Sequence, residues 1–198
     1  ALRRPRDNEE YRKTLSIIAG ECVHMSTMVE DLLFLTRVES QAVSTTYKEV
    51  KVTRFVSYLT SQVSKIFEKK SIQLKTVVDN TEFIYCSSNY LQIALKNILM
   101  NAAKHSEFGG EVFFHCYSDE NDNSFKIQDF GEGISPEDLP HIFDSFYRVD
   151  TARNRSEGGI GIGLSLAVAL VKMHKGEIKV ESELGKGTSF TVNIPKLV

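Results

Sequence analysis

Eight of the 12 glycines in this chain gather in three short groups, and this clustering limits the possible folds more than any other feature. The groups are Gly131 and Gly133; Gly158, Gly159, Gly161 and Gly163; and Gly185 and Gly187. Glycine is needed where the backbone takes a positive φ or approaches a ligand closely. The middle group leads into a predicted helix over residues 163–175, whose amino end offers free N–H groups to an anion. This loop is a candidate phosphate-binding loop; a plain turn is the alternative.

Composition excludes several classes of protein. The chain has 24 Lys and Arg residues against 26 Asp and Glu residues, a net charge of 24 − 26 = −2. It therefore has no basic field that would attract nucleic acid. No apolar run approaches 18 residues, and residues 1–11 do not resemble a signal peptide. Cys22, Cys86 and Cys116 lie far apart without a CxxC spacing, which argues against a disulfide framework or a zinc site. We expect a cytoplasmic setting.

The N-terminal segment predicts one long helix over residues 8–40. Seven mostly apolar positions alternate between three- and four-residue spacings, which is typical of an a/d seam. They are Leu15, Ile18, Cys22, Met25, Val29, Leu32 and Thr36. We expect this seam to pack against other helices, including those of a second subunit. An amphipathic helix folded onto its own domain is the alternative.

The rest of the chain mixes helices with strands. Residues 41–49 break the helical pattern and indicate a linker, so the predicted domains are 1–42 and 43–198. Predicted helices cover 52–70, 89–105 and 163–175, and predicted strands cover 71–78, 111–118, 124–129, 176–182 and 188–194. Helices on one face of a mixed, mostly antiparallel sheet make an α+β fold, a two-layer α/β sandwich preceded by the long N-terminal helix.

A carboxylate stands beside the first glycine group. Asp129 closes a predicted strand just before Gly131. A buried carboxylate at this place could accept a hydrogen bond from an exocyclic amine, the feature that distinguishes adenine from guanine. A turn aspartate that caps the following loop is the alternative.

One face of the predicted helix over residues 89–105 is polar. Asn97 and Asn101 lie four residues apart, and their amide oxygens are of the kind that Mg²⁺ accepts as ligands. Lys104 follows one turn later and can meet a phosphate as a point charge. The alternative is the ordinary polar face of a half-buried helix.

Five segments in this order resemble the N, G1, F, G2 and G3 boxes of bacterial sensor histidine kinases. The segments are 97–105, 129–133, 143–148, 159–164 and 185–188. In that family these boxes form the catalytic ATP-binding domain, which has the Bergerat-type fold shared with gyrase, Hsp90 and MutL. The resemblance spans about residues 50–197, and five ordered motifs are more specific than any one of them.

The resemblance implies a role for each motif residue. Asn101 would bind Mg²⁺, and Asp129 would bind the adenine amine. Catalytic roles would fall to Asn97, Lys104 and Arg148, with Arg148 at the γ-phosphate. The other implied ATP-binding residues are His105, Gly131, Gly133, Ile134, Tyr147, Gly159, Gly161, Gly163, Leu164 and Thr188, and Lys104 and Arg148 belong to this set as well. Thr188 would support Asp129, and residues 150–157 resemble a lid over the nucleotide.

Residues 9–40 resemble the second helix of the dimerisation and phosphoacceptor hairpin of the same family. The first helix with its acceptor histidine is absent, and Met25-Ser26 directly follows His24 instead of an acidic residue, so we expect His24 not to accept phosphate. We therefore expect a kinase fragment. Its implied partners are ATP, the acceptor helix of the parent kinase and a response regulator. The parent protein is expected to dimerise through the N-terminal helix and to be anchored in the inner membrane.

Three functions compete on this evidence. In the gyrase and Hsp90 branch, a glutamate one helical turn before the metal-binding asparagine orients water for hydrolysis, and Asn97 stands at that place here. The sequence therefore predicts the part of a protein-histidine kinase that transfers the γ-phosphate of ATP to a histidine. The alternatives are a non-kinase ATPase of the same fold and a catalytically silent nucleotide-binding module.

Overall fold

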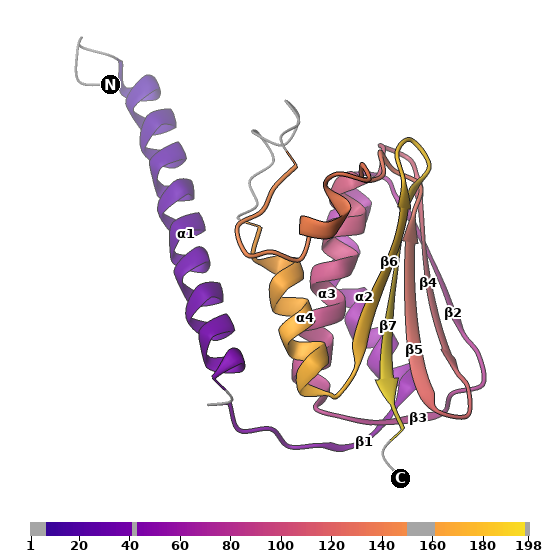
Figure 1. The fold of residues 1–198 in the computed structure, drawn as a ribbon. Helices are drawn as coiled ribbons and strands as arrows, with labels where there is room; N and C mark the ends of the chain where they lie inside the picture. The colour runs from indigo at the N-terminus through magenta and orange to yellow at the C-terminus, as the bar shows by residue number, and fades with distance from the viewer. Residues whose placement is uncertain (1–6, 41–42, 150–160, 197–198) are drawn as a thin grey trace.

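The computed structural model describes residues 7–40, 43–149 and 161–196, except for the side chain of His24 (Figure 1). In chain order the elements are α1 (Asn8–Glu39), β1 (Lys48–Lys51), α2 (Val52–Lys69), β2 (Gln73–Val78), β3 (Phe83–Cys86), α3 (Ser88–His105), β4 (Glu111–Ser118), β5 (Asp122–Asp129), the 3₁₀ turn η1 (Leu139–His141), α4 (Gly163–Met173), β6 (Glu177–Glu183) and β7 (Gly187–Pro195). The helices and the main strands lie where the hydrophobic spacing predicts them.

A five-stranded sheet forms one layer of the molecule, and α2, α3 and α4 cover one of its faces (Figure 1). The strand order is β2-β4-β5-β7-β6, with β2 parallel to β4 and the other neighbouring pairs antiparallel. Inward and outward residues alternate along the strands, so that β7 buries Phe190, Val192 and Ile194 and turns the residues between them outward. The predicted α+β sandwich with a mixed sheet is confirmed.

The apolar core lies between α3 and the sheet. Leu91, Leu95 and Ile98 recur at helical spacing and are completely buried. Phe114 of β4 and Phe190 of β7 belong to the same buried cluster. Because this apolar stripe sets the rotation of α3, the polar positions of the helix are brought together on another side.

Two short strands, β1 and β3, are absent from the sequence-based prediction. They pair antiparallel, with Val50 opposite Ile84. Each has only four residues, which is too few for a clear alternation of apolar and polar positions. Strand β2 begins at Gln73 rather than at residue 71, because Ser71 takes a φ of 52° in the turn that follows α2.

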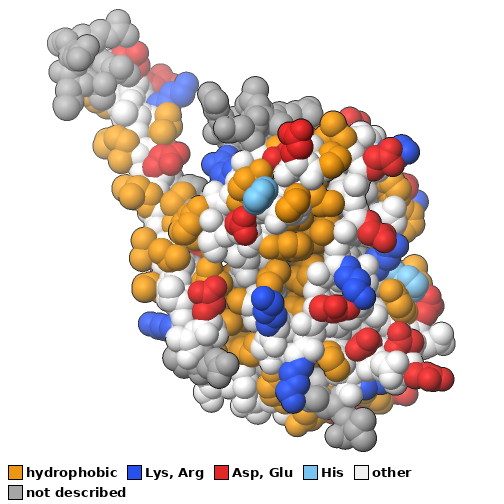
Figure 2. Space-filling view, in the orientation of Figure 1, with side chains coloured by type: hydrophobic (Ala, Val, Ile, Leu, Met, Phe, Trp, Pro, Cys, Tyr) orange, Lys and Arg blue, Asp and Glu red, His pale blue; other side chains and the backbone are white. Residues whose placement is uncertain are grey.

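Helix α1 extends away from the sandwich, and its C-terminal end packs on it (Figure 1). There Leu35 and Val38 are buried, and the ring of Phe34 lies 5.8 Å from the ring of Tyr90 on α3. Most of the predicted seam is exposed, and Figure 2 shows hydrophobic side chains along this part of α1. The alternative of a helix folded along its length onto its own domain therefore does not describe α1.

The division of the chain at residue 42 stays a prediction, because residues 41–42 lie outside the described part. Beyond them, the segment before β1 is attached to the sandwich: the hydroxyl of Tyr47 donates to the carbonyl oxygen of Met173 at 2.7 Å. In the ranges that the structure describes, none of the helices combines the length and apolar character that crossing a membrane requires.

Candidate functional site

A cavity of about 800 Å³ opens beyond the end of β5. Segments that are far apart in the sequence line it: the end of α2, the second half of α3, the loop after β5, Ile142 with residues 147–149, the start of α4 and the hairpin between β6 and β7. This volume is typical of a site for a small molecule.

Asp129, the last residue of β5, lines this cavity and is only 3% exposed. Its Oδ1 accepts hydrogen bonds from the backbone N–H groups of Gly131 at 3.0 Å and Thr188 at 3.3 Å. Burial raises the pKa of Asp129, and these two bonds oppose the shift. Both bonds end on Oδ1 and neither uses Oδ2. The carboxylate can therefore receive an amino group of a bound molecule on its second oxygen.

Thr188 supports Asp129 through its backbone rather than through its side chain. Its N–H group donates to Asp129, whereas its hydroxyl shares a hydrogen bond of 2.9 Å with Oγ of Ser182. Oγ of Ser182 also accepts from the backbone N–H of Ile134 at 2.9 Å. The hairpin between β6 and β7 is thereby fastened to the loop after β5.

Two glycines let the loop after β5 approach its neighbours more closely than a side chain would permit. A Cβ at Gly131 would lie 2.0 Å from the carbonyl oxygen of His105, at the end of α3. Gly133 has a φ of 69°, and a Cβ there would lie 2.1 Å from the carbonyl oxygen of Glu183. Glu132 adds a side-chain contact, since its Oε1 lies 2.6 Å from Nδ1 of His105. The loop therefore connects α3 to the hairpin.

Helix α3 supplies a polar wall of the cavity. Asn97, Asn101 and Lys104 follow one face of the helix, and all three line the cavity. Gly163, the first residue of α4, is a neighbour of this wall, because a Cβ there would lie 3.5 Å from Oδ1 of Asn97. Lys70 donates from Nζ to the carbonyl oxygen of Lys104 at 2.6 Å and so caps the end of α3. Amide oxygens, an ammonium group and a helix N-terminus thus meet in one cavity.

The amide oxygens of this wall suit a magnesium ion that also binds the phosphates of a nucleotide. Within the described ranges, no three histidine, cysteine, aspartate or glutamate side chains gather as a metal site. Mg²⁺ in nucleotide sites keeps several waters and binds the substrate phosphates, so one or two protein oxygens suffice. Asn101, which lines the cavity, carries such an oxygen.

Residues 147–149 form another part of the cavity wall. Tyr147 and Arg148 both line the cavity. The backbone N–H of Phe146 donates to the carbonyl oxygen of Gly161 at 2.9 Å. Gly161 has a φ of 78°, and a Cβ there would lie 2.5 Å from the carbonyl oxygen of Tyr147. This segment is therefore packed directly against the residues that precede α4.

Most of the residues predicted from the motifs lie around this cavity. Those that line it are Asn97, Asn101, Lys104, His105, Asp129, Gly133, Ile134, Tyr147, Arg148, Gly161, Gly163, Leu164 and Thr188. Gly131 is not among the lining residues, and its N–H donates to Asp129. Gly159 and the predicted lid over residues 150–157 lie outside the described residues. The roles assigned to all these residues stay predictions.

Sequence reasoning missed several residues of the cavity wall. Ile66, Lys69 and Lys70 at the end of α2 line the cavity, and so do Glu132 and Asp138. No spacing connects α2 to the motifs, because its last turn reaches the cavity only through packing against α3. For the two acidic residues a signal was available, since they stand within and shortly after the first glycine group.

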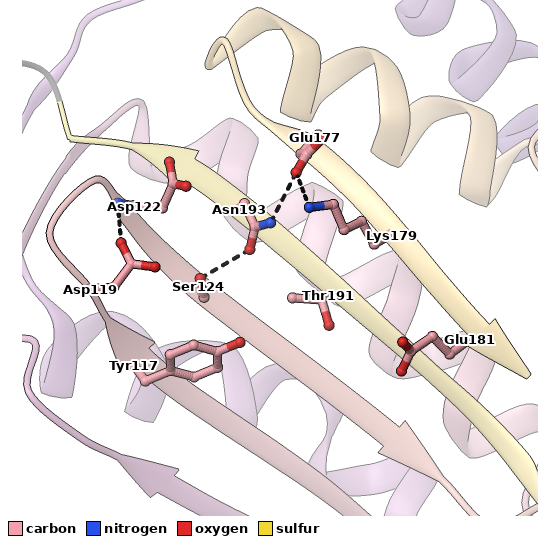
Figure 3. Close-up of a pocket in the computed structure, with 9 residues that line it drawn as sticks. All are labelled: Tyr117, Asp119, Asp122, Ser124, Glu177, Lys179, Glu181, Thr191 and Asn193. Carbon is pink, nitrogen blue, oxygen red and sulfur yellow. Dashed lines mark hydrogen bonds and ion pairs between the residues drawn. The ribbon is translucent and has the colours of Figure 1, made fainter.

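A second pocket of about 330 Å³ lies on the face of the sheet that the helices leave open (Figure 3). Its polar side chains bond to one another. Asn193 accepts from Oγ of Ser124 at 3.0 Å and donates to Glu177 at 3.2 Å, while Lys179 lies 2.7 Å from Glu177. None of the residues predicted from the motifs lines this pocket. The larger cavity is therefore the candidate functional site.

The sequence is similar to known proteins over nearly its whole length. The sequence model of the histidine kinase-, DNA gyrase B- and HSP90-like ATPase family matches residues 86–198, a segment that starts just before α3. Sensor protein SrrB of Staphylococcus aureus (strain NCTC 8325 / PS 47) is 31% identical over 199 residues, which cover 95% of this chain and 32% of SrrB. The chain thus spans about a third of the length of the curated relatives it matches.

Solved structures share the fold. Acinetobacter baumannii histidine kinase AdeS superimposes with a TM-score of 0.75 at 21% identity, over 98% of this chain and 88% of AdeS. Full-length ShkA, solved in complex with AMPPNP, gives a TM-score of 0.82 at 21% identity, over 98% of this chain and 41% of ShkA. The mycobacterial sensor histidine kinase MprB gives 0.65 at 26% identity, over 76% of this chain and 98% of the MprB chain.

The family match covers more than half of the chain and includes α3, the loop after β5 and the hairpin that together enclose the cavity. The fold of the whole chain agrees with it. The chain therefore belongs to the histidine kinase-, DNA gyrase B- and HSP90-like ATPase family and corresponds to the catalytic domain of a sensor histidine kinase.

Proposed function

We propose that this chain binds ATP with Mg²⁺ and transfers the γ-phosphate to a histidine on a helix that the chain itself does not contain. The observation that carries the proposal is that buried Asp129 and the polar wall of Asn97, Asn101 and Lys104 border the same cavity of about 800 Å³. The cavity thus combines an acceptor for a purine amine with groups that suit a metal-bound triphosphate.

Each polar group has a separate task in this proposal. Asp129 accepts the exocyclic amine of adenine, which guanine lacks at that position. Asn101 binds Mg²⁺, and the bound ion offsets the charge of the phosphates. Lys104 meets phosphate oxygens as a point charge, and Arg148 meets the γ-phosphate with its planar fork of donors. The free N–H groups at the start of α4 add further donors to the anion.

The transfer itself needs little covalent chemistry from the protein. A nitrogen of the acceptor imidazole attacks the γ-phosphorus, the bond from this phosphorus to the β,γ-bridging oxygen breaks, and ADP leaves. The chain contributes orientation and charge stabilisation. We do not expect His24 to be the acceptor, because Met25 and not an acidic residue directly follows it.

A kinase is favoured over a hydrolase because, among the described residues that line the cavity, the carboxylates of Glu132 and Asp138 are engaged by other side chains. Asn97 stands where a hydrolase of this fold needs a glutamate, and an amide is no general base. Glu132 is paired with His105 at 2.6 Å. Asp138 accepts from the hydroxyl of Tyr147 at 2.6 Å. A silent nucleotide-binding module is the other alternative, and the presence of all five motifs argues against it.

Calorimetry of the 198-residue chain with ATP and GTP, with and without Mg²⁺, tests the binding step. We expect ATP to bind more tightly with Mg²⁺ than without it, and GTP to bind at least about 10-fold more weakly than ATP. Absence of nucleotide binding would contradict the whole proposal.

Transfer in trans tests the chemistry. The chain is mixed with a separately supplied acceptor hairpin and ATP labelled at the γ-phosphate, and label is expected on the hairpin. A hairpin whose acceptor histidine is replaced by glutamine is the control and should stay unlabelled. Steady hydrolysis of ATP without transfer would favour the ATPase alternative.

The partners of the parent kinase follow from the same proposal. They are the acceptor helix, in the same or a second subunit, and a response regulator that receives the phosphate. The exposed apolar residues of α1, such as Met25 and Val29, support a homodimer through this helix. A cytoplasmic setting and a membrane anchor of the parent protein stay predictions.

A further inference from the structure

A hydrogen bond between two loops holds the residue immediately before Arg148. The hydroxyl of Tyr147 donates to Oδ1 of Asp138 at 2.6 Å. The second oxygen of Asp138, Oδ2, accepts from Oγ of Ser135 at 2.7 Å. Ser135, Asp138, Tyr147 and Arg148 all line the candidate cavity. Both oxygens of one carboxylate are therefore engaged at the cavity wall.

The charge state of this pair makes the contact directional. The hydrogen bond from Tyr147, followed by that from Ser135, lowers the pKa of Asp138, so this carboxylate is ionised at neutral pH. The same bond raises the pKa of Tyr147, so the phenol keeps its proton. A neutral hydroxyl that donates to a carboxylate forms a charge-assisted hydrogen bond, which is stronger than one between neutral groups.

A second attachment fixes the backbone just before Tyr147. The N–H of Phe146 donates to the carbonyl oxygen of Gly161 at 2.9 Å, and Gly161 leaves no room for a side chain beside Tyr147. The ring of His141 lies 5.3 Å from the ring of Tyr147. Residues 146 and 147, directly before Arg148, are thus held between the loop that contains Asp138 and the residues that lead into α4.

This geometry changes the role expected of Tyr147. The family resemblance implies that Tyr147 binds the nucleotide, but its hydroxyl proton is already donated to Asp138. A side chain engaged in this way orients its neighbour instead of binding a phosphate with its hydroxyl. Because the two residues are adjacent, fixing Tyr147 limits the positions that Arg148 can take.

We propose that Asp138 and Tyr147 are positioning residues that hold Arg148 toward the γ-phosphate and thereby set how strongly the site distinguishes ATP from ADP. This inference rests on the proposed function, in which Arg148 contacts the γ-phosphate. It adds a prediction that the proposed function does not make by itself. Loss of the hydrogen bond between Asp138 and Tyr147 should lower the affinity for ATP and leave the affinity for ADP unchanged, since ADP has no γ-phosphate.

The test compares the affinities for ATP and ADP in the presence of Mg²⁺, by calorimetry on the 198-residue chain. Tyr147→Phe and Asp138→Ala should each lower the ratio of ATP affinity to ADP affinity by about 10-fold, the size of one hydrogen bond to a charged group. Asp138→Asn keeps an oxygen that can accept from Tyr147, and it should restore most of the ratio.

Asp144→Ala is the matched control, because it removes a carboxylate from the same segment and leaves the hydrogen bond between Asp138 and Tyr147 in place. Asp144 is exposed, contacts His141 at 3.0 Å and does not line the cavity. Its variant should keep the parent ratio. In an Arg148→Gln background, which itself should lower the ratio, Tyr147→Phe should produce no further change, since both act through one contact. The thermal midpoint of each variant shows whether it is folded.

Several outcomes would overturn the inference. Equal losses of ATP and ADP affinity would mean that the pair only stabilises the loops. Three other results would separate the pair from the γ-phosphate. The ratio of ATP affinity to ADP affinity could stay unchanged in both Tyr147→Phe and Asp138→Ala, or it could stay unchanged in Arg148→Gln. The effect of Tyr147→Phe could also persist in the Arg148→Gln background. Failure of the proposed function looks different, because the parent chain would then bind neither nucleotide.

Discussion

Replacement of Asp129 with asparagine removes a charge from the cavity and keeps the shape of the side chain. In the parent, Oδ1 of Asp129 accepts from Gly131 and Thr188. The amide oxygen of the variant takes over these two bonds, so its NH₂ group comes to the place of Oδ2 and confronts the adenine amine as a second donor. A lost hydrogen bond to a buried charged group corresponds to about 1.5–3 kcal/mol, so we expect ATP affinity to fall by about 10- to 100-fold.

The same substitution should not destabilise the chain without nucleotide. Burial raises the pKa of Asp129 above its ordinary value of 3.8. The folded chain therefore binds the proton of this carboxyl more tightly than the unfolded chain does. As the pH rises from below the unfolded-state pKa to above the folded-state pKa, ionisation of Asp129 lowers the unfolding free energy of the parent. Asparagine does not titrate. The difference in unfolding free energy, variant minus parent, should therefore increase over that pH interval and stay constant at neutral pH.

Two measurements on the same protein samples check this reasoning. Calorimetry gives the affinity for ATP, and urea unfolding between pH 3 and pH 7 gives the free energy of unfolding. Asp122→Asn, a charge-matched change at the other end of β5 and outside the cavity, is the control. Parent-like ATP binding by Asp129→Asn would refute the adenine contact. A clear loss of stability at pH 7 would instead identify Asp129 as a turn aspartate whose main task is to cap the following loop.

Three further predictions concern other parts of the chain. Asn101→Ala should remove most of the Mg²⁺ dependence of ATP binding and leave metal-free binding within about 2-fold of the parent in calorimetry; a retained Mg²⁺ dependence would contradict the metal role. Gly131→Ala would place a Cβ 2.0 Å from the carbonyl oxygen of His105, so urea unfolding should show a loss of about 3 kcal/mol or more, with ATP binding lost as well; a parent-like variant would show that the loop can move. Met25→Glu, at a position 61% exposed on α1, should weaken self-association in sedimentation equilibrium and leave ATP affinity unchanged; a parent chain that is monomeric at high concentration would contradict a seam for dimerisation.

The regular elements follow from short-range patterns. Leu91, Leu95 and Ile98 recur at the period of a helix, and this single pattern predicts both the existence of α3 and the face that it buries. The alternation in β7 does the same for a strand. The short strands β1 and β3 escape such reasoning, because four residues carry too little periodic signal and only their pairing with each other stabilises them.

The candidate site is partly predictable for a different reason. Glycines and polar residues at particular spacings mark the loop after β5 and the wall of α3, and the resemblance to one family orders these motifs along the chain. The contribution of α2 is not marked in this way. Lys70 caps α3 at the carbonyl of Lys104, a contact between residues that share no motif.

By itself, the sequence determined the class of fold, the family and the residues that are candidates for binding a nucleotide, because periodicity and motif spacing are properties of neighbouring positions. Only the tertiary structure decided which partner each polar atom takes. Tyr147 donates to Asp138, and Thr188 reaches Asp129 through its N–H group and not its hydroxyl. The first contact joins residues nine positions apart, and the second joins residues 59 positions apart. Both depend on how the loops fold in three dimensions, which spacing along the chain does not encode.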